Sequence, residues 1–211
     1  MAPSSDSSPS SYANPTPDEP WQPGIGAPAR IDLRQYDQSW YSPGRSKLWV
    51  LLWWLVQAVV FPLTLHAHHA PRRLLLRWFG ARIGRGVVIR PSARFHYPWQ
   101  IEIGDYSWVG SGVEFYSLGP IRLGNHTVVS QNTYLCTGSH NPADPAFGLR
   151  VAPITIENGA WVAANCFIGP GVTVGANSIV GARSSVFADL PADHICLGSP
   201  CKPLKPRAIA Q

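Results

Sequence analysis

ITIENGAWVAANCFIGPGVTVGANSIVGARSSVF, residues 154–187, carries a large aliphatic side chain at every sixth position. These positions are Ile156, Val162, Ile168, Val174, Val180 and Val186. An amphipathic helix would repeat such residues every 3.6 positions, and a half-buried strand every second position. A period of six instead fits short strands joined by tight corners, with one large apolar side chain pointing inward from each strand. Three such strands close a triangular coil, and stacked coils bury a continuous apolar column.

The same period extends upstream. Its earlier positions are Ile83, Ile89, Phe95, Ile103, Val109, Phe115, Leu123, Val129 and Leu135. The repeat then comprises fifteen hexads, which predict five triangular coils. Most hexads also carry a small or β-branched residue four positions later: Val87, Ala93, Ser107, Val113, Thr127, Thr133, Ser139, Ala160, Cys166, Val172, Ser178 and Ser184. We therefore expect residues 83–190 to form an all-β domain, a parallel β-helix.

Three irregularities of the repeat fall at one corner of the predicted prism. Two-residue slips follow the third hexad of the first and second coils. An insertion at 141–155, which is Pro-rich and long for a connection, follows the third hexad of the third coil. We expect a functional site at this corner. Periodicity does not fix the handedness of the coils.

The other segments differ in composition. Residues 1–29 are rich in Ser, Pro and Ala and predict a disordered tail. Residues 30–82 predict a linker followed by an apolar helix, and residues 191–211 a C-terminal extension. The apolar run LWVLLWWLVQAVVFPLTL spans 48–65, and Pro62 should end or kink its helix near Phe61. A membrane-spanning helix, an interfacial helix lying on the inner membrane, and a helix packed against its own β-domain all fit this run.

Charge and cysteine content exclude some classes of protein. The net charge is +5, and residues 30–82 carry eight basic against two acidic residues. No extended Lys/Arg stripe predicts nucleic-acid binding, whereas a phosphate-bearing ligand or an anionic membrane surface fits. The four cysteines lack disulfide or zinc spacing, so we expect free thiols. With no secretory signal at the start, we expect a cytoplasmic protein, with association to the inner face of the membrane left open.

Three motifs carry a family resemblance. The stretch from Ile154 to Lys205, LCTGSHN at 135–141 and LLLRWFGARIG at 74–84 resemble the hexapeptide-repeat acetyltransferases, most closely their colanic-acid (exopolysaccharide) branch. The resemblance covers roughly residues 72–205. It implies a left-handed β-helix, a homotrimer with sites between subunits, and transfer of an acetyl group from acetyl-CoA to a hydroxyl. The acceptor it implies is a sugar, a lipid-linked saccharide or another surface-polysaccharide precursor.

His140 is the expected catalytic residue. Acyl transfer from a thioester needs a base to take the proton of the acceptor hydroxyl, and imidazole titrates in the right range. The matching family position is the catalytic histidine, whereas the alternative is a solvated loop histidine. Asn141 stands where many relatives have Asp, which leaves open what orients the imidazole.

Other site residues follow from the resemblance or from the predicted register. Trp161 matches an aromatic beside the bound pantetheine, and Ala163, Gly181 and Ala182 match small positions along it. The candidates for the phosphates of coenzyme A are Arg183, Lys202 and Lys205. In the predicted register the acceptor candidates are Glu114, Tyr116 and Asn132. The alternative is that these are ordinary corner residues, a surface tryptophan and a solvated basic tail.

Two rival functions remain open at this point. A carbonic-anhydrase-like zinc hydratase needs three converging histidines, but His96, His126 and His140 are predicted to point to different places. His66, His68 and His69 form a local cluster that fits a solvated or headgroup-facing segment. We therefore expect no metal requirement. The second rival is a non-catalytic β-helical scaffold at the membrane, which would bind no coenzyme A.

Overall fold

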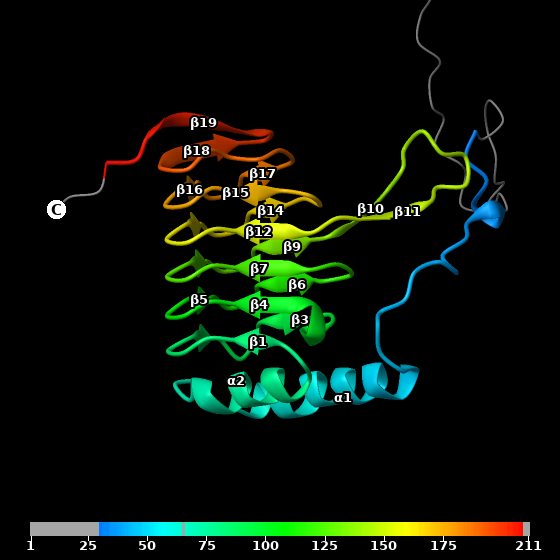
Figure 1. Cartoon of the computed structure of the whole chain (residues 1–211), viewed down its shortest axis with the longest axis horizontal. Coiled ribbons are helices and arrows are strands. Elements are labelled where there is room, and N and C mark those ends of the chain that lie inside the picture. The colour runs from blue at the N-terminus through cyan, green and yellow to red at the C-terminus, as the bar shows by residue number, and fades with distance from the viewer. Residues whose placement is uncertain (1–29, 65, 209–211) are drawn as a thin grey trace, which may run out of the picture. The chain divides into compact units, whose positions relative to one another are not determined.

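The computed structural model describes residues 30–64 and 66–208. Three sheets of short parallel strands wrap around one apolar column and form a β-solenoid (Figure 1). The solenoid has about six turns and follows two helices. The prediction of five coils was therefore one turn short, and the fold is mostly β rather than all-β. The prediction of a disordered tail at 1–29 lies outside the described residues.

Each sheet forms one face of the prism. Face 1 consists of β1 (Arg82–Ile83), β4 (Ile101–Ile103), β7 (Ile121–Leu123), β12 (Ile154–Ile156) and β15 (Thr173–Val174). Face 2 consists of β2 (Val88–Ile89), β5 (Trp108–Val109), β8 (Val128–Val129), β13 (Trp161–Val162), β16 (Ile179–Val180), β18 (His194–Gly198) and β19 (Cys201–Pro206). Face 3 consists of β3 (Arg94–Phe95), β6 (Glu114–Tyr116), β9 (Tyr134–Cys136), β14 (Phe167–Ile168) and β17 (Ser185–Val186).

The interior of the solenoid follows the repeat. All fifteen predicted inward positions are buried, and the rings of Phe95 and Phe115 stack with centroids 4.8 Å apart. The predicted small positions are buried as well, with one exception. Ser139 is exposed, because the chain leaves the coil after Thr137. The period of six therefore predicted the column correctly, apart from the place where an insertion begins.

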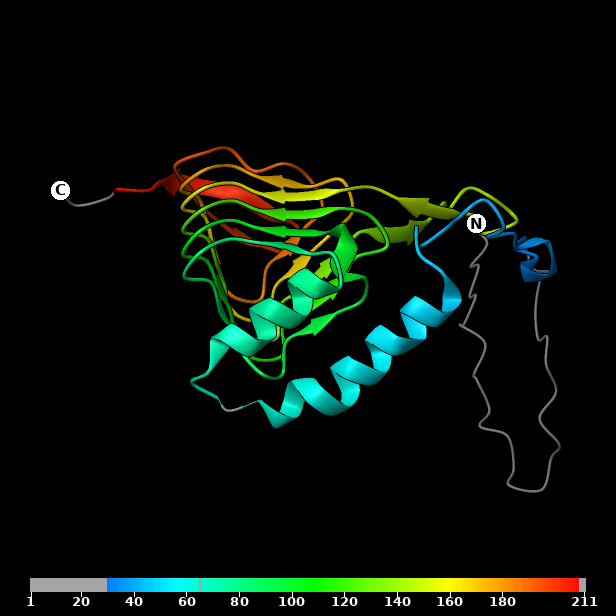
Figure 2. The ribbon, with the colours of Figure 1, turned by 60° about the horizontal axis from the view of Figure 1, so that its bottom comes forward.

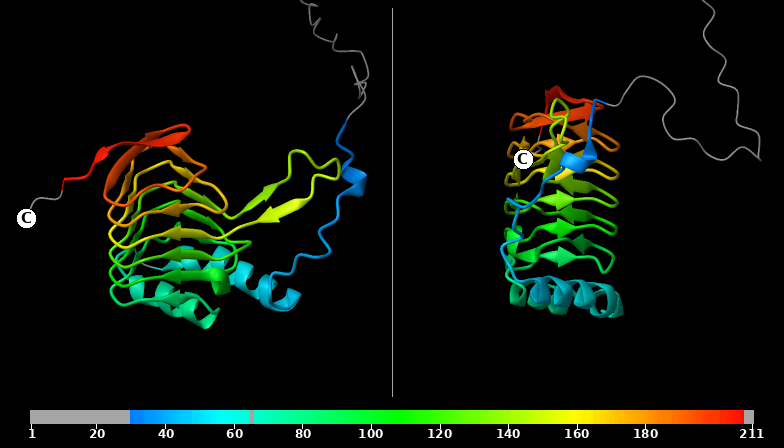
Figure 3. Two further views of the ribbon diagram at one scale, coloured as in Figure 1. Left: turned by 45° about the horizontal axis from the view of Figure 1, so that its top comes forward. Right: turned by 90° about the vertical axis from the view of Figure 1, so that its right-hand side faces the viewer.

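The corner between faces 3 and 1 carries all three irregularities, as predicted. The first two are the turn η2 (Pro98–Gln100) and the loop 117–120. The third is a hairpin of β10 (Gly138–His140) and β11 (Leu149–Val151), which projects from the solenoid (Figure 3). We call residues 138–151 the arm. The insertion was predicted at 141–155, but it begins and ends earlier in the chain. The hydrogen bonds between coils end where Thr137 N donates to Tyr116 O and resume where Ile154 N donates to Pro120 O.

Two helices lie side by side across the first coil (Figure 2). The first, α1 (Lys47–Leu63), is capped by Ser46 and ends one residue after Pro62, close to the predicted end. The second, α2 (His69–Trp78), was not predicted. We call the two together the helical layer. Among the described residues, no helix is both long and apolar enough to cross a membrane.

The helical layer satisfies the open edge of the first coil. A strand edge leaves backbone groups without partners, which is costly when water is excluded. Side chains of the helices replace the missing coil. Their contacts are Arg77 Nη2 to Ile83 O (2.6 Å), Arg73 Nη1 to Val87 O (2.8 Å), Arg72 Nε to Ile89 O (2.7 Å), Trp53 Nε1 to Phe95 O (2.7 Å) and Phe95 N to Gln57 Oε1 (2.6 Å). The arginines of α2 are thus structural, and Arg72 is fully buried.

Residues 31–46, which we call the strap, connect the arm to the helical layer (Figure 3). They include the short helix η1 (Leu33–Gln35). At the arm, Asp32 N donates to Pro145 O at 2.8 Å. Further along, the Tyr41 hydroxyl donates to Leu118 O at 2.9 Å. The part of the chain predicted as a linker therefore packs along the same corner as the arm.

The C-terminal extension closes the opposite end. Strand β18 continues face 2 in parallel, and β19 turns back antiparallel to it. All four cysteines are buried and unpaired, as predicted.

Candidate functional site

His140 lies on β10 of the arm rather than at the end of the third coil, where the repeat placed it. Its Nδ1 is 2.8 Å from the carbonyl oxygen of Phe147. Because a carbonyl only accepts hydrogen bonds, Nδ1 carries the proton and the lone pair of the neutral imidazole is on Nε2. The ring also stacks on the Phe147 ring, with centroids 4.1 Å apart and planes within 10°. Phe147 therefore sets both the tautomer and the plane of His140.

The tip of the arm holds Phe147 in place. Phe147 adopts the left-handed backbone conformation, with φ of 54°. The Asp144 carboxylate accepts hydrogen bonds from Ala146 N and Gly148 N, both at 3.0 Å. Sequence reasoning missed Asp144 and Phe147 as supporting residues. The dipeptides Asp144–Pro145 and Phe147–Gly148 were the available signal, because Pro and Gly mark turns.

Tyr36 of the strap is a further residue that sequence reasoning missed. Its ring lies 5.8 Å from that of His140, and its hydroxyl donates to Gln38 Oε1 at 2.9 Å. The strap brings Tyr36 there from more than 100 positions upstream, with no local pattern to indicate it. A neighbour of His140 thus comes from a segment that the sequence predicted as a linker.

Face 3 carries two acceptor candidates, one of them at the base of the arm. Glu114 and Tyr116 lie on β6, and Tyr116 borders Gly138, where the arm begins. Burial, followed by the nearby Cys136, raises the pKa of Tyr116, so its hydroxyl stays protonated at neutral pH. Asn132 lies elsewhere, with φ of 56°, at the corner between faces 2 and 3.

An aromatic row runs along face 3. Neighbouring rings have centroids 5.0–6.0 Å apart, and the row consists of His96, Tyr116, Tyr134, Phe167 and Phe187. Burial lowers the pKa of His96. Aromatic rings of this kind are suited to packing against the apolar face of a sugar or against a second protein chain.

The coenzyme candidates lie on face 2 and at the corner between faces 2 and 3. Trp161 projects from β13 with 42% of its surface exposed, and its Nε1 donates to Ser130 Oγ at 2.9 Å. Ala163 and Gly181 are neighbours in adjoining coils, where they follow the paired residues Val162 and Val180. Lys202 and Lys205 are exposed on β19.

The small corner residues are not equivalent. Ala163 N donates to Val180 O and Gly181 N to Cys196 O, so both N–H groups are already used within the solenoid. A Cβ on Gly181 would lie 2.9 Å from Leu197 Cβ, which gives this glycine a packing role. Among the described residues, none accepts a hydrogen bond from Ala182 N. Arg183 follows in the left-handed conformation, with φ of 60°.

The structure does not bring His140 together with the coenzyme candidates in one chain. The arm leaves the corner between faces 3 and 1, whereas Trp161, Ala182 and Lys202 belong to face 2 and its corner with face 3. Within residues 30–64 and 66–208, no hydrogen bond or ring contact links the two sets.

His96 and His126 lie apart from His140 and from each other, as predicted. His96 belongs to the aromatic row, and His126 stacks on Tyr106 at the corner between faces 1 and 2. His66 Nε2 lies 2.7 Å from Arg90 Nη1, whereas His69 Nδ1 lies 3.0 Å from Ile89 O. No three His, Cys, Asp or Glu side chains of the described part of the chain converge as metal ligands.

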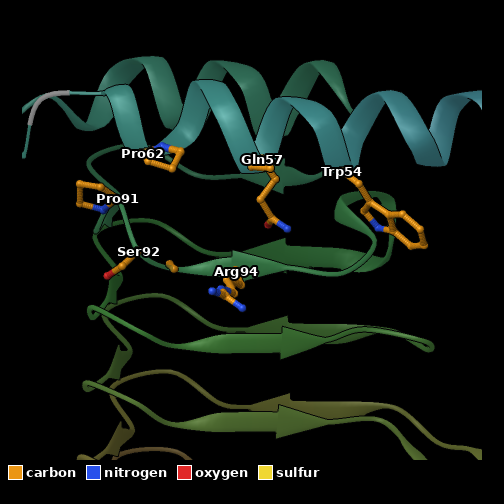
Figure 4. A pocket seen from close by; sticks show the side chains of 8 residues that line it. Trp54, Gln57, Pro62, Pro91, Ser92 and Arg94 are labelled. Atoms are coloured by element: carbon orange, nitrogen blue, oxygen red, sulfur yellow. The ribbon is translucent and has the colours of Figure 1, made fainter.

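A pocket of about 590 Å³ lies away from His140, between α1 and the first coil (Figure 4). Its lining residues are Trp54, Gln57, Ala58, Pro62, Pro91, Ser92, Ala93 and Arg94. The sequence did not predict this pocket.

Comparison with known proteins relates this architecture to one family. Residues 153–188 match the family described as "Bacterial transferase hexapeptide (six repeats)". A hexapeptide-repeat acetyltransferase of Vibrio cholerae, crystallised with acetyl coenzyme A, has a TM-score of 0.65 at 29% identity, covering 72% of this chain and 86% of that one. A galactoside acetyltransferase in complex with coenzyme A has a TM-score of 0.68 at 25% identity, covering 75% and 80%.

The protein named "Putative colanic acid biosynthesis acetyltransferase WcaF" of Escherichia coli is 48% identical over 164 residues, which cover 78% of this chain and 90% of the relative. At this identity and coverage the two proteins share fold and family. The chain belongs to the hexapeptide-repeat acetyltransferases.

Proposed function

We propose that this enzyme transfers an acetyl group from acetyl-CoA to a hydroxyl of a sugar in a surface-polysaccharide precursor. The names of the relatives support the donor and the acceptor class. The observation that carries the proposal is the orientation of His140: Phe147 holds the ring with Nδ1 at a carbonyl oxygen, so the lone pair of the base form lies on Nε2. Within the described chain, no residue forms a hydrogen bond with Nε2, which leaves it available to a substrate hydroxyl.

The reaction follows from this tautomer. His140 Nε2 takes the proton of the acceptor hydroxyl while the oxygen attacks the thioester carbonyl. The C–S bond then breaks, and the departing thiolate of coenzyme A takes the proton from the imidazolium. A general base of this kind typically contributes about 10²–10⁴-fold to the rate. The acetyl group thus passes directly from the thioester to the acceptor oxygen, without a covalent acyl-enzyme intermediate.

The coenzyme would lie along face 2 of a neighbouring chain. Exposed Trp161 would contact the pantetheine, which would run past Ala163, Gly181 and Ala182. The free Ala182 N–H fits a pantetheine carbonyl, and exposed Arg183 and Lys202 fit the phosphates. On the acceptor side, Tyr116 lies at the base of the arm, Glu114 lies on the same strand, and Asn132 is a candidate from the neighbouring corner.

A homotrimer of left-handed coils is part of the proposal. In this assembly the arm of one chain reaches the proposed coenzyme site of the next. The separation of His140 from the coenzyme residues supports an assembly in which each site draws on two chains.

The test is release of free thiol from acetyl-CoA against a panel of sugars and lipid-linked glycans, with wild type and His140→Ala in parallel. His126→Ala is the matched control, because His126 is an exposed histidine on another corner. Acceptor-dependent release that only His140→Ala abolishes would support the proposal. If no acceptor works and acetyl-CoA gives no protection against thermal unfolding, the non-catalytic scaffold becomes the better reading.

A further inference from the structure

The helical layer has two apolar faces. Its inner face packs on the first coil through Val50, Trp53, Phe61 and Leu76. Its outward face is also apolar, although it faces solvent. The exposed large apolar residues are Leu48, Leu51, Leu52, Trp54, Leu55, Val59, Val60 and Leu63 on α1, with Leu74 and Trp78 on α2. A helix that is apolar all around is normally covered on every side, so this outward face predicts a binding partner.

The geometry of the layer favours a flat partner. Both helices lie side by side in one layer at the end of the solenoid (Figures 1 and 2). The exposed positions on α1 recur at spacings of three and four, so they form a stripe along the whole helix. Because the inner side of α1 is already packed on the first coil, only its outward stripe would rest on a membrane, and Trp at the boundary of a membrane interface is typical of such contacts. Trp78 is 74% exposed.

The charge around the layer favours anionic lipids. Between Asp37 and Glu102 the sequence has nine basic residues and no acidic one. Arg82 and Arg85 form ion pairs with Glu102 and Asp105, whereas Arg45 and Lys47 are exposed at the start of α1. Basic residues beside an apolar face are attracted to anionic headgroups. The same charges would repel the layer of a second copy of this chain, which argues against self-association through this face.

The pocket beside α1 adds a basic recess at the rim of the layer. Trp54 and Gln57 of α1 line it on one side and Arg94 of β3 on the other (Figure 4). Among the described residues, Arg94 has no hydrogen bond or ion pair through its side chain. The phosphate of an anionic lipid that entered this pocket could therefore bind the Arg94 guanidinium.

We propose that the outward face of the helical layer docks onto the surface of a membrane that contains anionic lipids. The face lies at one end of the solenoid, so docking leaves the arm and face 2 open. This inference does not depend on the acyl-transfer reaction, because vesicle binding needs neither acetyl-CoA nor acceptor.

The test is sedimentation of the full chain with vesicles of phosphatidylcholine alone or with about one quarter phosphatidylglycerol. Leu51→Gln, Leu55→Gln and Leu63→Gln are combined in one variant, since these side chains are 57%, 61% and 78% exposed. The control variant combines Leu33→Gln, Leu197→Gln and Leu204→Gln, three exposed leucines outside the layer. Thermal unfolding checks that both variants fold.

We expect binding to the anionic vesicles that weakens with salt, a loss of at least tenfold in the first variant, and no change in the control. Three results would overturn the proposal. The first is that the wild type does not bind the anionic vesicles. The second is that the control variant loses as much vesicle binding as the first variant. The third is that, in sedimentation velocity without vesicles, the wild type forms a larger assembly than the first variant does. The last result would assign the face to a second copy of the chain. Retained thiol release with a soluble acceptor would show that the catalytic proposal stands separately.

Discussion

Two inactive variants should restore activity when they assemble together. His140→Ala removes the proposed base from the arm, and Ala182→Tyr adds a bulky ring to the proposed coenzyme site at the corner between faces 2 and 3. If each active site combines the arm of one chain with the coenzyme site of its neighbour, a mixed trimer contains active sites that neither variant can form alone. In an equal, random mixture, half of the arms carry His140 and half of the neighbouring coenzyme sites carry Ala182. About one quarter of the sites then have both, and about one quarter of the wild-type rate should return.

The assay is thiol release after both variants are denatured together and reassembled. Wild type treated in the same way gives the reference rate, and each variant reassembled alone gives the background. Differently tagged copies, purified through both tags, establish that mixed assemblies form. If such mixed assemblies show only the background rate, His140 and Ala182 do not combine across chains, which would refute an active site shared between two chains.

Three further predictions concern stability. Leu135→Ala opens a cavity in the apolar column and should cost about 2–5 kcal/mol in urea unfolding, whereas Leu197→Ala at an exposed position should cost far less. Arg77→Met leaves Ile83 O without its donor and should cost about 1–3 kcal/mol, against less than about 1 kcal/mol for Arg82→Gln in a surface ion pair; equal losses would contradict the edge role. Burial lowers the pKa of His96 in the native chain. As the pH drops below about 6.5, His96 binds a proton in the unfolded chain before it does so in the native chain, so the free energy of unfolding should fall. Melting temperatures at pH 7 and pH 5 should differ less in His96→Phe than in wild type, and an unchanged difference would refute this cause.

The column of the solenoid was predictable because the period of six acts through local geometry. Each hexad places its own residue inward, so Ile83 and Val186 obey the same rule despite their distance in sequence. The clustering of irregularities at one corner followed from the same count. The sixth turn was missed because the period fades after Val186, although Cys196 still pairs beside Val180.

Other features depend on contacts that no local pattern encodes. The three arginines of α2 are explained only by the coil edge that they cover. The orientation of His140 depends on the backbone carbonyl of Phe147, and any residue has such a carbonyl. Tyr36 reaches His140 only because the strap bonds to the arm. The assignment of the coenzyme residues came from resemblance, and their roles stay predictions.

The edge contacts of the helical layer have a consequence for solubility. A solenoid is a stack that another molecule could extend, since the last strand of each face offers the same backbone pattern as the strands within. On the first coil, the backbone N–H and C=O groups of the strand edges are hydrogen-bonded by Trp53, Gln57 and the arginines of α2. At the far end, the β18–β19 hairpin covers face 2. These contacts at the two ends therefore hinder the head-to-tail assembly of solenoids into fibres. A chain that lacked both helices should polymerise through β1, β2 and β3, and light scattering would detect its filaments.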